Sequence, residues 1–150
     1  MTDNKTNVWA RRKARRALVQ ALYEWQLSEN SLSDIKNEFH ESDALKRADK
    51  NFFDELLGLT IRGAQELDGL YEHLLDRKIE QLGHVERAVL RLATAEFSHR
   101  IDVPYVAVID EYVELSKTFG AQDSYKYING VLDKLAIDLR PIEVEAAKRG

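Results

Sequence analysis

Residues 84–100, HVERAVLRLATAEFSHR, decide the fold class of this chain. If this stretch is a helix with about 100° per residue, apolar side chains lie on both of its sides. One side carries Val85, Ala88, Val89 and Leu92, and the other carries Leu90, Ala93 and Phe97. A helix that is apolar all round is typical of a protein interior. The sequence therefore predicts a central helix covered by its neighbours.

Helical periods continue on both sides of this stretch. Working outward, we expect helices at about 10–27, 32–39, 48–62, 64–80, 104–120 and 123–139. Pro104 suits the first turn of its helix, and Ser31 or Ser33 is available to cap the second. Only two prolines occur, and no run has the alternation of a strand. The sequence predicts an all-α protein of about seven helices, with a frayed tail over residues 142–150.

Composition limits the class of protein. A chain of 150 residues with 44% apolar side chains is sufficient for one domain, or for two small subdomains that share a core. The chain has no cysteine, so disulfides and thiolate metal sites are excluded, which fits a reducing compartment. No stretch approaches the roughly 18 uncharged apolar residues of a membrane span. We expect a soluble, cytoplasmic protein with no membrane partner.

The stretch 9–26, WARRKARRALVQALYEWQ, joins a basic cluster to an apolar helical stripe. Positions 1–16 hold six basic side chains and one acidic side chain, although the net charge of the chain is −4. Positive charge at a helix N-terminus opposes the helix dipole, at about 0.3 to 1 kcal/mol per group, so local stability does not explain the cluster. One interpretation is a solvated helix start. The other is a docking surface for a polyanion.

Helical geometry places an aromatic ring beside two of these charges. When each residue turns the helix by about 100°, Arg12, Arg16 and Tyr23 fall together on the outward face, away from the apolar side that carries Leu18. Guanidinium groups hold phosphate oxygens, and an exposed ring stacks on an unpaired base. This pattern suits single-stranded RNA better than duplex DNA.

Catalytic and metal-binding alternatives receive little support. Glu96 and His99 form an E-x-x-H pair, a spacing that supplies two ligands to a di-iron centre, but the second pair that such a site needs does not occur. We therefore interpret Glu96 as a buried, hydrogen-bonded carboxylate. The sequence has no P-loop, dinucleotide-binding turn or nucleophile elbow, so we expect no enzyme, cofactor or metal.

Two other non-enzymatic classes stay open at this point. A helical DNA-binding repressor is one, although the positive charge lies in the N-terminal arm and not on a candidate recognition helix. The other is a bundle that binds only proteins, which predicts no salt-dependent binding of RNA.

Two segments carry a resemblance to a known family. ARRKARRALVQALYEWQLS (10–28) and LGHVERAVLRLATAEFSHRIDVPYVAVIDEYVELSKTFGAQDSYKYINGVLDK (82–134) closely resemble the bacterial transcription antitermination factor family NusB, and the match extends from about Ala10 to Pro141. The resemblance implies two packed three-helix bundles with one extra helix. Residues 10–141 are then the RNA-binding domain, and residues 1–9 are expected to be a flexible extension.

The resemblance also implies a function and its partners. Members of this family bind the boxA element of leader and ribosomal RNA transcripts, and from the residue pattern we expect this chain to bind boxA as a single strand. They act with the ribosomal protein NusE in an RNA polymerase antitermination complex, and they help the polymerase read past terminators.

The family's RNA-binding positions transfer to this chain residue by residue. The basic motif falls on Arg11, Arg12, Lys13, Arg15 and Arg16, and the aromatic residue of the first helix is Tyr23. The acidic residue of VERAVLR is Glu86. The F-G-A-x-D-S loop runs from Phe119 to Ser124 and includes Asp123, and Lys126 and Tyr127 follow it. Tyr127 stands where the family often has phenylalanine, so a stacking ring is retained. We also expect Asp123 to cap the last helix, with its charge at the edge of the RNA path.

Overall fold

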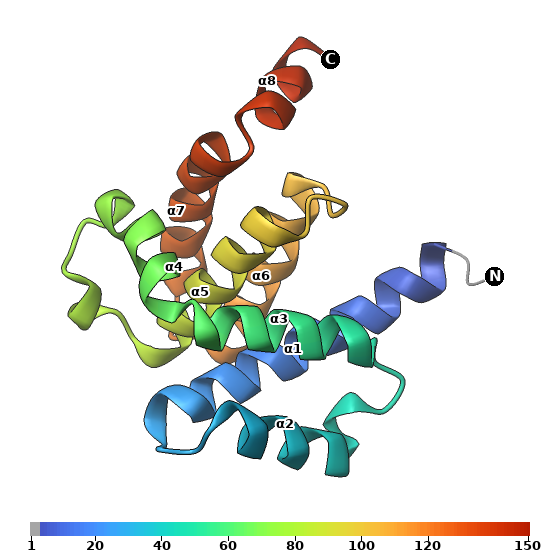
Figure 1. Ribbon diagram of the computed structural model, residues 1–150. Coiled ribbons are helices and arrows are strands. Elements are labelled where there is room, and N and C mark those ends of the chain that lie inside the picture. The colour runs from blue at the N-terminus through green and yellow to red at the C-terminus, as the bar shows by residue number, and fades with distance from the viewer. Residues whose placement is uncertain (1–3) are drawn as a thin grey trace. The chain divides into compact units, whose positions relative to one another are not determined.

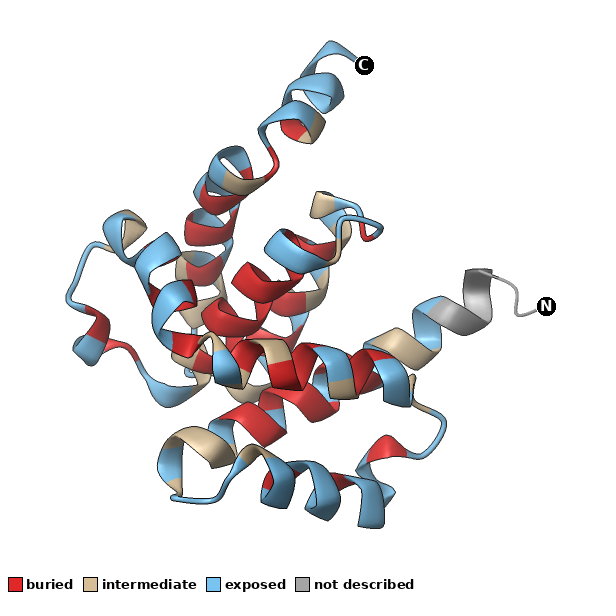
Figure 2. Cartoon of the chain, viewed as in Figure 1, coloured by how far each residue is buried: buried red, intermediate tan, exposed pale blue. Residues whose placement is uncertain are grey.

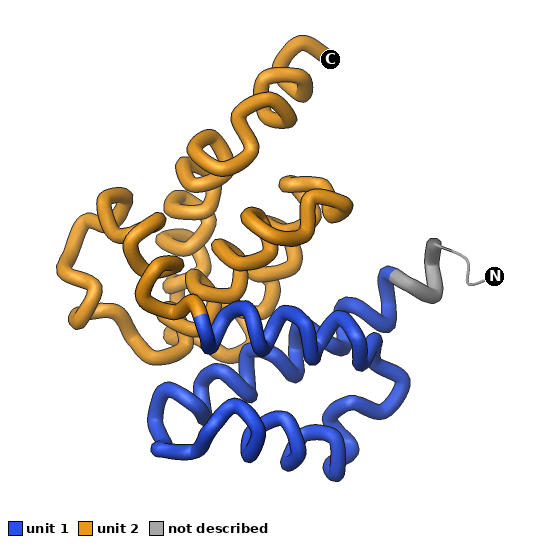
Figure 3. The backbone as a smooth tube through the Cα atoms, viewed as in Figure 1, with its two compact units in different colours: residues 1–62 blue, residues 63–150 orange. Residues whose placement is uncertain are grey.

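The computed structural model describes the backbone of residues 4–150 and the side chains from Val8 onward. The chain divides into two compact units, residues 1–62 and residues 63–150 (Figure 3). Over the described residues, every regular element is a helix, with eight α-helices and three short 3-10 turns (Figure 1). The prediction of an all-α fold is confirmed.

The first unit is a three-helix bundle. Its helices are α1 (Asn4–Leu27), α2 (Leu32–Glu41) and α3 (Lys50–Arg62), and α1 packs against both of the others. Five side chains of the predicted stripe on α1 are at most 1% exposed: Ala14, Ala17, Leu18, Ala21 and Leu22. Between α2 and α3, the rings of Phe39 and Phe53 stack at 5.8 Å. Burial of these apolar faces holds the three helices together.

Helix α2 begins where its cap residue predicts. The hydroxyl of Ser31 accepts a hydrogen bond from the Asp34 backbone N–H at 3.1 Å, and the Asp34 carboxylate accepts one from the Ser31 N–H at 3.3 Å. This reciprocal capping box satisfies two backbone donors at the start of the helix. Of the two candidate serines, Ser31 is therefore the cap.

The second unit is built around α5 (His84–His99). Helices α4 (Ala64–Tyr71), α6 (Tyr105–Phe119) and α7 (Ser124–Leu139) all pack against α5, and α8 (Pro141–Arg149) follows α7. Every residue of α5 from 88 to 97 is buried (Figure 2). Glu96 is fully buried and accepts a hydrogen bond from the Tyr112 hydroxyl at 2.9 Å. Both the central helix and the buried carboxylate were predicted correctly.

The helix expected at 64–80 is shorter than predicted. Helix α4 ends at Tyr71, and two 3-10 turns, Glu72–Leu74 and Ile79–Gln81, lead to α5. Between them the backbone is extended at Leu75 and Lys78, which lets Ile79 and Leu82 turn inward and become buried. Burial of these two side chains overrides the helical tendency of the segment.

Both chain ends are more helical than predicted. Residues 1–3 of the expected flexible extension lie outside the described residues, and residues 4–9 form the first turns of α1. The tail expected to fray is helix α8, with Pro141 in its first turn and Val144 buried. Pro104, in contrast, is the N-cap residue of α6, one position before its first turn.

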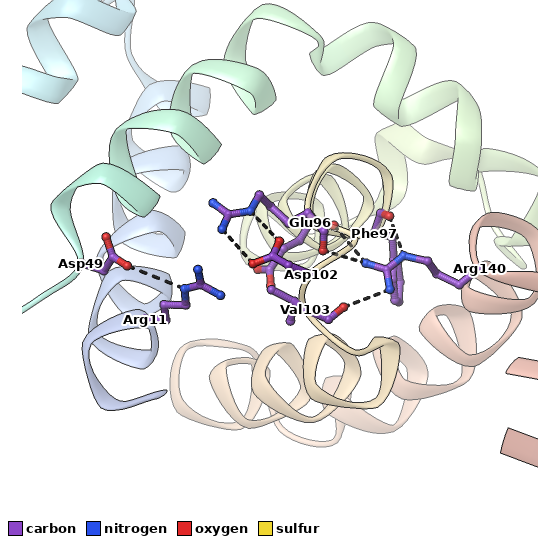
Figure 4. Close-up of polar contacts among 8 residues, drawn as sticks. Arg11, Asp49, Glu96, Phe97, Asp102, Val103 and Arg140 are labelled. Carbon is purple, nitrogen blue, oxygen red and sulfur yellow. Dashed lines mark hydrogen bonds and ion pairs between the residues drawn. The ribbon is translucent and has the colours of Figure 1, made fainter. Parts of the chain in front are cut away.

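Arg140 explains why α8 forms. This side chain is 4% exposed, and its guanidinium donates hydrogen bonds to the carbonyl oxygens of Phe97 at 2.8 Å, Val103 at 3.0 Å and Arg100 at 3.0 Å (Figure 4). It also pairs with Glu143 at 2.6 Å, in the first turn of α8. The junction between α7 and α8 is thereby tied to the loop between α5 and α6.

Candidate nucleic-acid interface

The outward face of α1 carries an exposed group of cationic and aromatic side chains. Arg12, Lys13 and Arg16 are exposed, and Tyr23 is 40% exposed, as the helical periodicity predicted. The Arg12 guanidinium lies 4.9 Å from the centre of the Trp9 ring, which is 53% exposed. We call Trp9, Arg12, Lys13, Arg16 and Tyr23 the α1 surface.

Trp9 was not among the predicted site residues, although helical periodicity places it on the same face of α1. With about 100° per residue, Trp9 falls on the side of the helix opposite Leu18, close to Arg16 and Tyr23. The α1 surface therefore has an aromatic ring near each end, with cations between them. Alternation of rings and cations is typical of surfaces that bind single-stranded nucleic acid.

The other two arginines of the basic motif pack inside the first unit. Arg15 is 4% exposed, and the guanidinium groups of Arg11 and Arg15 lie 5.0 and 5.1 Å from the centre of the Phe52 ring. Arg11 also lies 3.7 Å from the Asp49 carboxylate (Figure 4). These contacts join α1 to the start of α3, so packing accounts for Arg15 and for much of Arg11.

Tyr127 in the second unit has a partner that the sequence did not reveal. The Arg77 guanidinium lies 4.1 Å from the centre of the Tyr127 ring, and the Tyr127 hydroxyl accepts a hydrogen bond from the Asp76 backbone N–H at 3.4 Å. Arg77 also pairs with the Asp76 carboxylate at 2.7 Å, which holds the pKa of Asp76 below its usual value. One face of the Tyr127 ring is therefore covered by a cation.

Lys126 and Asp123 lie next to each other at the start of α7. Lys126 is exposed, and its ammonium nitrogen is 3.6 Å from the Asp123 carboxylate. Asp123 occupies the N-cap position with φ at 67° and ψ at 0°, and its side chain makes no capping hydrogen bond. The prediction that its carboxylate caps α7 is wrong. Its position is explained by the left-handed backbone, which aspartate and asparagine tolerate better than most residues.

The loop before α7 has a second conformational requirement. Phe119 is the half-buried last residue of α6, and Gly120 follows it. A Cβ atom at Gly120 would lie 2.6 Å from the carbonyl oxygen of Ser116. The F-G-A-x-D-S sequence therefore has a structural role as a tight connection between α6 and α7, independent of any contact with RNA.

Glu86 has a clear local role. Its carboxylate accepts a hydrogen bond from the Gly83 backbone N–H at 2.9 Å and so satisfies a backbone donor at the start of α5. The pKa of Arg77 is raised mainly by Asp76, and Glu86 contributes to the rise through its charge.

The structure separates the eleven predicted site residues into two sets. Six lie on α1 in the first unit: Arg11, Arg12, Lys13, Arg15, Arg16 and Tyr23. Five lie in the second unit: Glu86, Phe119, Asp123, Lys126 and Tyr127. Among side chains from Val8 to Gly150, no three histidine, aspartate or glutamate residues are grouped to hold a metal ion. In the described part of the chain, no helix has the length and apolar character needed to cross a membrane.

Comparisons with known proteins identify the relatives of this chain. The model of the NusB family matches residues 12–137. The transcription antitermination protein NusB of Baumannia cicadellinicola is 52% identical over 134 residues, which cover 89% of this chain and 96% of that protein. NusB of Edwardsiella ictaluri is 49% identical over 132 residues, which cover 88% and 95%.

Solved structures agree with these sequence matches. NusB from T. maritima superimposes with a TM-score of 0.73 at 30% identity, over 84% of this chain and 89% of that one. NusB in a complex of NusB and NusE with double-stranded RNA superimposes with a TM-score of 0.74 at 29% identity, over 84% and 95%. Because both the family model and the relatives span most of its length, the chain belongs to the NusB family.

Proposed function

We propose that this chain is a transcription antitermination factor that binds boxA RNA together with NusE in the cytoplasm, where bacterial transcription takes place. The observation that carries the proposal is the α1 surface, on which Arg12 and Arg16 are exposed beside the rings of Trp9 and Tyr23. This is a binding function, and it needs no catalytic group. The family membership of the chain supports it.

The chemistry of the α1 surface suits RNA. Guanidinium groups form charge-assisted hydrogen bonds with phosphate oxygens, and exposed rings stack on bases. The chain as a whole has a net charge of −4, so a polyanion is repelled by most of the molecule and attracted where the cations gather. Binding is therefore directed to a limited part of the surface.

NusE is expected to supply the discrimination between RNA sequences that the α1 surface lacks. Phosphate contacts and stacking are largely independent of base sequence, so the chain alone discriminates boxA only weakly. The related NusB structure contains NusE and RNA in one complex. If NusE adds contacts on the same RNA, discrimination for boxA rises, and thermodynamic linkage requires RNA to tighten NusE binding by the same factor.

The proposal favours single-stranded over double-stranded RNA. Stacking on Trp9 or Tyr23 needs an unpaired base, whereas a duplex presents mainly phosphates and 2′-hydroxyl groups. The RNA in the related complex is double-stranded, so this preference needs a direct test.

The test is a fluorescence titration of labelled boxA RNA, a scrambled RNA and a boxA duplex, at two salt concentrations, with and without NusE. We expect the single-stranded boxA RNA to bind most tightly, with salt dependence and with a gain in affinity when NusE is present. Transcription through a terminator downstream of boxA should then increase when both proteins are added. Absence of salt-dependent RNA binding with NusE present contradicts the proposal and favours a bundle that binds only proteins.

A further inference from the structure

A pocket lies beside the α1 surface within the first unit. Its volume is about 260 Å³, and it lies between α1 and the 3-10 turn Asp43–Leu45. Seven residues line it: Lys13, Arg16, Ala17, Gln20, Asp43, Ala44 and Lys46. Lys13 and Arg16 therefore belong both to the α1 surface and to the pocket.

The charges of the pocket favour an anion. Three cationic side chains, Lys13, Arg16 and Lys46, line it with one carboxylate, Asp43. The cations outnumber the carboxylates in this lining, so its net charge is positive and attracts an anion. Ammonium and guanidinium groups of this kind donate charge-assisted hydrogen bonds to phosphate oxygens.

The remaining lining suits the rest of a nucleotide. Gln20 offers both a donor and an acceptor, which match the edge of a base, and Asp43 offers an acceptor for a ribose 2′-hydroxyl or a base amino group. Ala17 and Ala44 add apolar surface. The volume is slightly below the range of about 300 to 1,000 Å³ that is typical of drug-sized ligands, so one nucleotide is the appropriate size.

The segment that carries Lys46 is held in place against α1. The Asp49 backbone N–H donates to the Ala10 carbonyl oxygen on α1 at 3.0 Å, and the Lys46 N–H donates to the Asp43 carbonyl oxygen at 3.1 Å. Leu45 is 1% exposed, and Arg47 makes the sharp turn with φ at 64°. Because these bonds already fix the backbone around Lys46, less conformational entropy is lost when Lys46 binds a ligand.

We infer that this pocket binds one nucleotide of the RNA that lies on the α1 surface, with Lys46 as a phosphate contact from a second element. The inference rests on the proposed function and extends it, because it adds the segment between α2 and α3 to the RNA-binding surface. Arg16 links the two regions. The RNA path therefore continues from Tyr23 past Arg16 towards Lys46.

Lys46→Ala tests the inference, with Lys50→Ala as a matched control, because Lys50 is an exposed lysine of the same unit that does not line the pocket. A labelled single-stranded boxA RNA is titrated in the presence of NusE at several salt concentrations. RNA affinity falls as salt rises, and each lost phosphate contact makes the slope of log affinity against log salt shallower by about 0.7. Lys46→Ala should therefore weaken RNA binding about fivefold at ~0.1 M salt and leave it unchanged near ~1 M. Lys50→Ala leaves the slope unchanged.

A cross-linking measurement locates the RNA independently of affinity. The chain has no cysteine, so Lys46→Cys and Lys50→Cys each introduce a unique thiol for a photoreactive label. We expect the label at position 46 to modify one nucleotide of the bound RNA and the label at position 50 to give little product. Equal product from both positions overturns the inference.

The outcomes separate this inference from the proposed function. If the unsubstituted chain binds RNA and Lys46→Ala behaves like Lys50→Ala, the pocket is not part of the RNA path, and the proposed function stands. If the unsubstituted chain with NusE binds no RNA, both the proposed function and the inference about the pocket are wrong. Uridine monophosphate and inorganic phosphate are added as competitors. If either binds with an affinity that Lys46→Ala lowers, while RNA affinity is the same in Lys46→Ala and Lys50→Ala, the pocket takes a free small anion and the RNA assignment is wrong.

Discussion

The Arg77 guanidinium lies 4.1 Å from the centre of the Tyr127 ring, so a residue of the loop between α4 and α5 covers one face of an aromatic side chain on α7. The Tyr127 hydroxyl adds a hydrogen bond from the Asp76 N–H, at 3.4 Å. An RNA base that stacks on Tyr127 must use the other face or displace Arg77. The pair therefore has a role in the fold of the second unit, apart from any contact with RNA.

This pairing predicts that Arg77→Ala and Tyr127→Ala are non-additive in their effect on stability. Each substitution removes the same cation–π contact, so the double variant should lose less than the sum of the two single losses. Denaturant midpoints of the four proteins measure the coupling. Tyr127→Phe is the control, since it keeps the ring and should keep the coupling. Strictly additive losses would show that the contact has no energetic weight.

Tyr23 is expected to act through its ring and not through its hydroxyl. Tyr23→Phe should leave RNA affinity nearly unchanged, whereas Tyr23→Ala should cost about 1 to 3 kcal/mol of binding free energy through lost stacking. Because Tyr23 is 40% exposed, the melting temperature should change little in either variant. The measurement is an RNA titration alongside a thermal melt. Similar affinities in the two variants exclude stacking.

The basic motif should divide into binding and packing residues. Replacing Arg12 and Arg16 together with alanine should lower the salt slope of RNA binding by about 0.7 per lost contact and preserve the fold. Arg15→Ala should leave that slope unchanged and lower the free energy of unfolding by about 2 kcal/mol, since Arg15 is buried against Phe52. A salt titration and a denaturation curve for each variant check this division. If Arg15→Ala changed the salt slope of RNA binding and left the free energy of unfolding unchanged, Arg15 would be a binding residue and not a packing residue.

Two substitutions of Asp123 distinguish the effect of its charge on RNA binding from the effect of its backbone conformation on stability. Its φ of 67° is tolerated by asparagine, so Asp123→Asn should change stability by only a few tenths of a kcal/mol. Loss of the negative charge beside Lys126 should tighten RNA binding, most clearly at low salt. Asp123→Ala should cost about 1 kcal/mol of stability, because alanine disfavours the left-handed region. If Asp123→Asn binds RNA no better at any ionic strength, the RNA path does not reach this end of α7.

Glu24 and Glu38 predict a pH-dependent stability in the first unit. Burial raises the pKa of Glu24 above its ordinary value of 4.5, and a hydrogen bond with Glu38 and the charge of Glu38 raise it further. A carboxyl group with a raised pKa favours folding once it is protonated, so stability is gained as the pH falls through the pKa of the folded state. At neutral pH, Glu38→Gln removes the like charge and should raise the melting temperature.

The control for this pair is Glu29→Gln, an exposed glutamate in the loop before α2. The gain from Glu38→Gln should shrink as the pH falls through the raised pKa of Glu24, since a protonated Glu24 no longer repels the charge of Glu38. Melting curves at neutral and mildly acidic pH measure this difference. A gain that is equal at both values, or that also occurs in Glu29→Gln, contradicts the interpretation.

Much of the α1 surface was predictable because helix geometry is local. At about 100° per residue, the sequence places Arg12, Arg16 and Tyr23 on the outward face, and the structure agrees. The same periodicity puts Arg11 and Arg15 on the side of the apolar stripe, but the motif resemblance placed them with the RNA-binding residues. Here the periodicity carried information that the motif did not.

Hydrophobic periods and motif order can be read along the chain, so they were sufficient to predict most of the helices, the central position of α5 and the family, but not the early end of α4 or the presence of α8. Which charges and rings come into contact depends on tertiary packing and could not be predicted from the sequence. Arg77 covers Tyr127 from a distant loop, and Lys46 joins Arg16 at one pocket although the two are far apart in the sequence. Such contacts depend on how loops return against helices, and the left-handed backbone of Asp123 depends on the turn that it closes. No local propensity specifies contacts of the first kind, because they arise when distant segments pack together, whereas the conformation of Asp123 depends on the short turn between α6 and α7.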